Sequence, residues 1–203
     1  LLRSQHIYAI SNAHHDEGLF MKLASHVVRG EWLGPYDQLT LSKGPAYPLF
    51  IATNFWAGLP LALTQQLLYV AGCAAIIWAI KPLLQANWAR LLAFSFLVFN
   101  PLTYEGETMT RILRQHLTVP LALFMVAGVM AICLRRDAAR SWRGFWAAAV
   151  GLCLGVFQLT REEGVWILPL FVLAGGALLA VSWKQGKTKR LEVGVMAVLV
   201  ALF

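Results

Sequence analysis

The sequence contains few charged residues and few cysteines, and both shortages restrict what the chain can be. Charged side chains make up 13% of the 203 residues, whereas hydrophobic ones make up 59% and the mean hydropathy is +0.62. Soluble domains carry about 45–50% apolar residues, so the composition excludes an ordinary soluble domain and predicts a membrane protein. Cys73, Cys133 and Cys153 lie in apolar runs without CxxC spacing, which predicts packing roles rather than disulfides or metal ligands.

The chain also lacks an initiator methionine and an apolar signal peptide. It begins at Leu1, its first residues are too polar for the apolar region of a signal peptide, and Phe203 falls inside an apolar run. We therefore expect the sequence to be a fragment of a longer protein, missing a helix before Leu1 and further residues after Phe203.

Long apolar runs follow residue 59, several of them near the 18 or more residues that a membrane-spanning helix requires. The predicted spans are 60–80, 88–100, 112–134, 144–159, 164–183 and a truncated run at 191–203. Pro120 is tolerable as a kink within a helix bundle. We predict an all-α fold in which residues 60–203 form a polytopic transmembrane bundle of about six spans. Residues 1–59 would be an extracytoplasmic loop with juxtamembrane helices, including a short interfacial helix at 46–58.

The net charge of +7 is explained by loops on one side of the predicted bundle. The loops 81–90, 135–143 and 184–190 together hold ten basic residues and one acid, Asp137. Loops rich in Lys and Arg face the cytoplasm, so the charge does not require a nucleic-acid partner. This pattern predicts an integral protein of a bacterial inner or plasma membrane.

The opposite, extracytoplasmic side collects most of the remaining charged and ionisable side chains. Ionisable groups near the hydrocarbon boundary are costly, so their clustering favours a functional role. The candidate site residues are His14, His15, Asp16, Glu17, Lys43, Glu105, Glu107, Arg111, Arg114, Arg161 and Glu162.

Asp16 and Glu17 begin an amphipathic stretch whose apolar residues recur at helical spacing up to Gly30. A carboxylate held there can act as a general base on an acceptor hydroxyl. The alternative is that both acids only complement the helix dipole in the first turn.

The nearby cations suit a phosphate group. Lys43 can bind phosphate as a point charge, and Arg111 and Arg114 are expected to share one helix face. The alternatives are a lysine that extends to lipid headgroups and surface ion pairs of little energetic value. Arg161 and Glu162 would bind a lipid phosphate or sugar, or else only cap two spans.

His14 and His15 could ligate a metal with Asp16, although this spacing is not diagnostic. No cofactor is required by the sequence, and a divalent metal is left open.

The order of these motifs resembles the GT-C superfamily of membrane glycosyltransferases, especially the protein O-mannosyltransferase and aminoarabinose transferase branch. Members commonly show an acidic pair in the first extracytoplasmic loop, which is similar to Asp16-Glu17 here. A K-x-P-L-type segment follows in the family and is similar to residues 43–49, KGPAYPL, with Gly44 where Pro is more usual. The segment 160–164, TREEG, resembles a later R-x-E-G-type turn.

The resemblance implies a helical bundle with juxtamembrane helices above an extracytoplasmic cavity. It implies inverting transfer of a sugar from a polyprenyl-phosphate donor to a lipid, glycan or protein acceptor of the cell envelope. By the same resemblance, Asp16 would be the base and Glu17 a supporting group. The resemblance also implies that Lys43 would hold the donor phosphate with help from Arg111, Arg114 or Arg161. Apart from the resemblance, Glu105, Glu107 and Glu162 are candidates for contacts with substrate.

Two other functions remain open. A transporter would need ionisable residues near the middle of its spans, and the interiors of the predicted spans contain little polar beyond Thr64, Gln65, Gln66, Ser95 and Gln158. A non-catalytic, lipid-binding membrane subunit would not require Asp16 and Lys43 to converge. The proximity of these two side chains therefore discriminates between the hypotheses.

Overall fold

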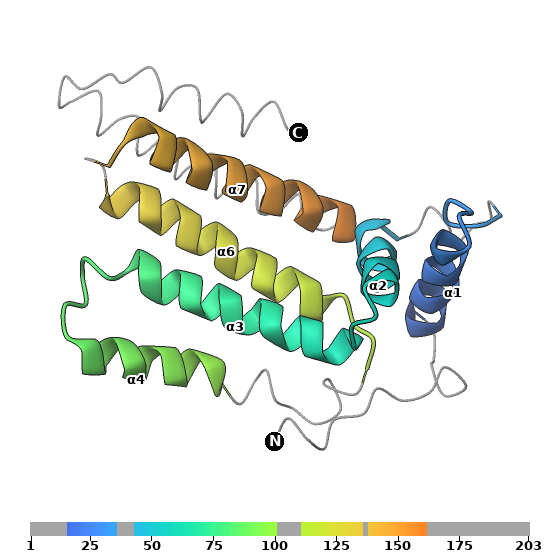
Figure 1. Ribbon diagram of the computed structural model, residues 1–203, viewed down its shortest axis with the longest axis horizontal. Helices are drawn as coiled ribbons and strands as arrows, with labels where there is room; N and C mark the ends of the chain where they lie inside the picture. Colours follow the sequence, from blue (N-terminus) through green and yellow to red (C-terminus); the bar gives the residue numbers. More distant parts are fainter. Residues whose placement is uncertain (1–15, 36–42, 101–110, 136–137, 162–203) are drawn as a thin grey trace.

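The computed structural model describes residues 16–35, 43–100, 111–135 and 138–161, and the regular structure within these ranges is helical (Figure 1). The helices are α1 (Asp16–Val28), α2 (Ala46–Trp56), α3 (Leu61–Ala79), α4 (Asn87–Val98), α6 (Gln115–Leu134) and α7 (Arg140–Thr160). No strand occurs in these ranges. The predicted all-α class is therefore confirmed for the described part of the chain.

Three helices, α3, α6 and α7, are long and apolar enough to cross a membrane. They contain 19, 20 and 21 residues, and at 1.5 Å per residue each reaches about 30 Å, the thickness of a bilayer's hydrocarbon core. They agree with the spans predicted at 60–80, 112–134 and 144–159, although α7 begins earlier, at Arg140. The structure thus supports a membrane protein.

The other three predicted spans are not confirmed by the described residues. The run at 88–100 forms α4, an apolar helix of 12 residues that is too short to count as a candidate span. The spans predicted at 164–183 and 191–203 lie outside the described residues. Within the described ranges there are accordingly three candidate spans, and the bundle of about six stays a prediction.

The helix α6 packs against both α3 and α7 (Figure 1), and glycines permit close approach. A Cβ atom on Gly128 would lie 2.3 Å from Val150 Cγ2 of α7, and one on Gly72 would lie 3.0 Å from Leu123 Cβ of α6. Small residues at such positions let helix backbones approach closely in a membrane. Pro120 is buried inside α6, and the helix continues through it as predicted.

The helices α1 and α2 lie at one end of the three long helices, with α2 between α1 and the bundle (Figure 1). The amphipathic stretch forms α1 as predicted, and the chain turns at Gly30, whose φ is +81°. The segment predicted as a short helix at 46–58 forms α2. The Phe20 and Tyr47 rings join α1 to α2 edge to face, with centroids 5.1 Å apart. A juxtamembrane location for this pair remains a prediction.

The chain direction places the loops at alternate ends of the bundle. The ends of α3 and α6 and the beginnings of α4 and α7 lie at the end opposite α1 and α2 (Figure 1). At this end Arg135, directly after α6, contacts α3, because its Nη2 donates a hydrogen bond to the Trp78 carbonyl at 2.8 Å. The described parts of two predicted basic loops therefore lie at the end of the helices opposite the acid pair, while their assignment to two sides of a membrane stays a prediction.

Candidate functional site

Side chains from distant parts of the chain meet at the end of the bundle that α1 and α2 cover. Lys43 Nζ lies 2.9 Å from Asp16 Oδ2. Arg111 Nε lies 2.5 Å from Glu17 Oε1, across 94 positions of sequence. The predicted acid pair and two of the predicted cations are thus brought into direct contact.

Helix geometry gives the two carboxylates different surroundings. Successive residues of a helix point about 100° apart, and Glu17 leads the buried stripe that continues through Phe20, Ala24 and Val27. The Glu17 side chain is only 11% exposed, whereas that of Asp16 is 51% exposed. Glu17 therefore faces the protein and fixes α1 to Arg111, while Asp16 stays accessible to a molecule from solvent.

Lys43 is held near the end of α7 by the glycine that follows it. A Cβ atom on Gly44 would lie 2.0 Å from the Leu159 carbonyl oxygen. Any residue other than glycine would therefore fit at position 44 only if the backbone moved. This contact places the Gly44 backbone, directly after Lys43, beside Leu159 and Thr160.

Arg114 links the same region to α1 and α7. Its Nη1 donates a hydrogen bond to the Thr160 carbonyl at 3.3 Å, and its guanidinium carbon lies 5.8 Å from the centre of the Phe20 ring. The prediction that Arg111 and Arg114 share a helix face is wrong, because α6 begins only at Gln115. The two arginines instead precede the helix; both contact α1, and Arg114 also contacts the end of α7.

A buried tyrosine lies beneath this cluster. Tyr47 is fully buried, and Gln65 Nε2 of α3 donates a hydrogen bond to its hydroxyl oxygen at 3.0 Å. Burial raises the pKa of Tyr47, and the negative charge of Glu17 adds to the rise while the Gln65 hydrogen bond opposes it. The sequence argument missed this residue, whose only signal was its place within the 43–49 segment.

The structure describes one of the remaining predicted site residues. Arg161 is exposed and follows α7 directly. His14, His15, Glu105, Glu107 and Glu162 lie outside the described residues. Among the residues that are described, no three of His, Cys, Asp and Glu lie close enough together to hold a metal.

The charges of the cluster favour an anionic ligand. Among the described residues, Lys43 and Arg111 pair with the two carboxylates and a third cation, Arg114, lies over Phe20 of the same helix, which leaves one positive charge in excess. Phosphate is bound by such arginine and lysine groups. The arrangement can therefore offer both a carboxylate and a phosphate-binding surface.

Comparison with known proteins adds no relative. No protein-family model matches the chain, and neither curated proteins nor solved structures give a match. The function is therefore inferred from the residues of this chain alone.

Proposed function

We propose that this chain belongs to a membrane glycosyltransferase of the GT-C type, which transfers a sugar from a polyprenyl-phosphate donor to an acceptor outside the cytoplasm. The observation that carries the proposal is the convergence of Asp16, Lys43 and Arg111 from three separate segments at one end of apolar helices. A transporter is less well supported, since the middle parts of α3, α6 and α7 hold no Asp, Glu, Lys or Arg.

In this proposal the Asp16–Lys43 pair is the resting state of the site. The donor phosphate attracts Lys43, which frees the Asp16 carboxylate for the acceptor. Asp16 takes the proton of the acceptor hydroxyl as its oxygen attacks the anomeric carbon from the side opposite the phosphate. The bond between the anomeric carbon and the phosphate oxygen breaks, and Lys43 with the arginines stabilises the charge on the departing lipid phosphate. Configuration at the anomeric carbon is inverted.

Glu17 has a positioning role in this scheme. Its buried carboxylate holds Arg111, and thereby keeps the head of α1 against the segment that precedes α6. Loss of Glu17 would move Asp16 as well as Arg111.

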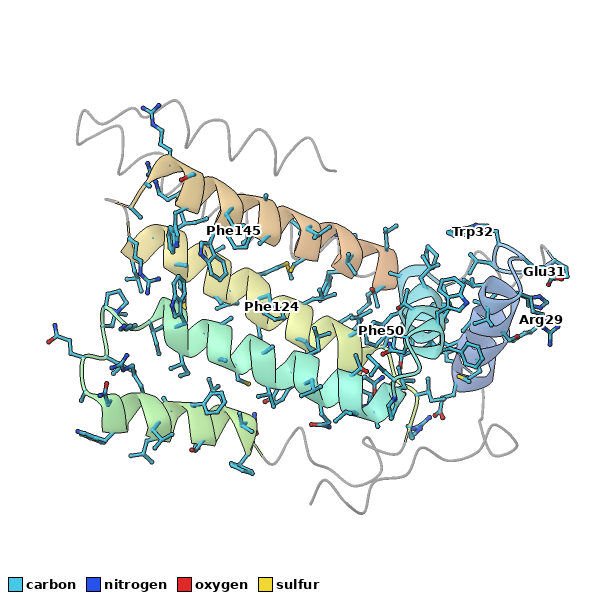
Figure 2. All side chains as sticks on the ribbon, in the orientation of Figure 1. Arg29, Glu31, Trp32, Phe50, Phe124 and Phe145 are labelled. Atoms are coloured by element: carbon cyan, nitrogen blue, oxygen red, sulfur yellow. The ribbon has the colours of Figure 1, made fainter. Side chains whose placement is uncertain are left out.

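The test is sugar transfer from a radiolabelled polyprenyl-phosphate sugar by membranes that carry the full-length protein. We expect Asp16→Asn to reduce transfer by 100-fold or more, in the range expected for a general base, at unchanged protein level. Glu31→Gln is the matched control, because it removes one carboxylate on the far side of α1 from the bundle (Figure 2). Transfer by Asp16→Asn at the wild-type rate would contradict the proposal.

A charge exchange separates chemistry from structure. The double variant Asp16→Lys with Lys43→Asp keeps an ion pair between α1 and the 43–45 segment. If Asp16 is the base, the double variant folds like wild type and still fails to transfer sugar. Recovery of transfer would show that only the ion pair matters.

A non-catalytic, lipid-binding subunit is the second candidate. The favouring observation is that both carboxylates already have a cation as partner, so the cluster can serve simply to fix α1 to the bundle. Absence of transfer by the wild-type protein with several donors would favour this candidate.

A further inference from the structure

The end of the bundle opposite the candidate site carries a cluster of tryptophans and arginine that the proposed function does not use. Trp78 at the end of α3 stacks on Trp146 of α7, with ring centroids 5.3 Å apart, and Trp142 lies 5.7 Å from Trp78. Arg135, directly after α6, places its guanidinium carbon 4.0 Å from the Trp78 ring centre and 5.4 Å from that of Trp142. Three helices thus contribute to one aromatic and cationic surface.

One of the two terminal nitrogens of the Arg135 guanidinium makes a hydrogen bond, and the other makes none within the described ranges. Its Nη2 donates to the Trp78 carbonyl at 2.8 Å, while Nη1 is buried and has no hydrogen-bond partner within the described ranges. A buried donor without an acceptor is costly. The tryptophan rings and the Trp78 carbonyl therefore fix the orientation of the side chain, and no carboxylate among the described residues neutralises its charge.

The surrounding charge is positive. Lys81 and Arg140 are exposed, the first three residues after Trp78 and the second two residues before Trp142. The described parts of the two loops contain no carboxylate, and the sequence between them adds one, Asp137. The surface therefore suits an anion.

Apolar side chains at the same end are exposed. Leu83, Trp88 and Phe145 are 63%, 70% and 66% exposed, and Phe145 projects from the beginning of α7 (Figure 2). Tryptophan is enriched at the membrane–water interface, where transmembrane helices leave the hydrocarbon core. An occupant with both a phosphate and acyl chains satisfies the cations and these apolar groups together, which an acidic protein surface would not.

We propose that this surface, formed by Trp78, Lys81, Arg135, Arg140 and Trp142, binds the headgroup phosphate of an anionic phospholipid. Basic pockets between transmembrane helices bind such headgroups, and each cation near an anionic surface contributes about 1 kcal/mol, which corresponds to about fivefold in affinity. The inference is independent of the transferase proposal, since it uses none of the same residues.

The test is thermal unfolding of the full-length protein in detergent with added short-chain phosphatidylglycerol, compared with phosphatidylcholine of identical acyl chains. We expect phosphatidylglycerol to raise the Tm more than phosphatidylcholine does. Inorganic phosphate at equal concentration serves as a third arm, and a shift as large as that with phosphatidylglycerol would show a free-anion site and overturn the lipid proposal. Equal shifts with the two lipids would also overturn it.

Two variants locate the effect. Arg135→Gln should lose most of the phosphatidylglycerol-specific shift, and Arg29→Gln, which removes a cation on the far side of α1 (Figure 2), should keep it. If Arg135→Gln fails to fold, the double variant Lys81→Gln with Arg140→Gln decides, because both side chains are exposed. It should weaken phosphatidylglycerol binding by about 25-fold if the two contributions add. Unchanged binding by the double variant would contradict the proposed surface.

Discussion

The two ends of the helix bundle hold their cations in different ways. At the end covered by α1 and α2, Lys43 and Arg111 are paired with the carboxylates of Asp16 and Glu17. At the opposite end, Arg135 lies against tryptophan rings and a carbonyl oxygen instead. An ion pair neutralises a cation, whereas an aromatic face positions it and leaves its charge for another partner. The first end therefore joins segments of chain through ion pairs, and the second presents a cation, Arg135, that no described carboxylate neutralises.

Gly44 offers the strongest way to disrupt the first end alone. We expect Gly44→Ala to destabilise the protein by about 3 kcal/mol, because its Cβ would collide with the Leu159 carbonyl. Thermal unfolding in detergent measures this loss. Gly155→Ala in α7 is the control, since no atom of the described residues lies within 4 Å of the new Cβ, and it should be neutral or stabilising. Equal Tm values for the two variants would contradict the close approach at residue 44.

Glu17 and Asp16 should respond differently to loss of charge. Breaking a buried pair costs about 3–5 kcal/mol, and we expect about 2 kcal/mol for Glu17→Gln because Arg111 is half exposed. For Asp16→Asn we expect less than about 1 kcal/mol, as for other exposed pairs. Unfolding experiments on the two variants measure the difference. A larger loss of stability for Asp16→Asn would reverse the roles assigned here.

Alkaline pH should weaken the first end through Tyr47. Because burial raises the pKa of Tyr47, the folded state favours the neutral phenol. The resulting stability is complete below the unfolded pKa of about 10 and is lost as pH rises above it, by up to about 1.4 kcal/mol per pH unit. The slope of Tm against pH should therefore be shallower for Tyr47→Phe than for wild type above pH 10. Equal slopes of Tm against pH for the two proteins would show that Tyr47 ionises as readily in the folded state as in the unfolded state.

The smallest expected difference between the two ends is in how their coupling energies respond to salt. A double-mutant cycle on Asp16 and Lys43 should give a coupling of about 0.5 kcal/mol that approaches zero in about 1 M salt. The same cycle on Arg135 and Trp78 should give about 0.5–1 kcal/mol and change less, because the guanidinium lies flat against a ring. A parallel decline of both couplings would remove the distinction drawn between the two ends.

The sequence was sufficient for the helices but not for their partners. Apolar runs predicted α3 and α6 closely, and the spacing from Leu19 to Val28 predicted α1. The beginning of α7 was placed too late because Arg140 to Arg143 interrupt the apolar run, although a helix continues readily beyond the apolar segment. The opposite error was made before α6, where charge spacing suggested a helical turn that the backbone does not form.

Contacts between distant residues were beyond a sequence argument. The cluster was predicted to gather on one side, yet nothing in the sequence indicated that Arg111 would pair with Glu17. The choice depends on how α1 lies against the bundle, which is set by the packing of Phe20 on Tyr47. The tryptophan and arginine cluster was not predicted, because those loops were interpreted by charge alone.

The separation of Glu17 from Arg111 also has a consequence for the order of assembly. Arg111 follows Glu17 by 94 positions. At about 5–20 residues per second, synthesis of this stretch takes roughly 5–20 s. Throughout that interval the head of α1 has no Arg111 to pair with, and the Thr160 carbonyl that accepts from Arg114 is made later still. The acid-bearing end of the molecule is therefore completed only when the last described helix has left the ribosome, whereas Trp78 and Arg135 can already be in contact by then.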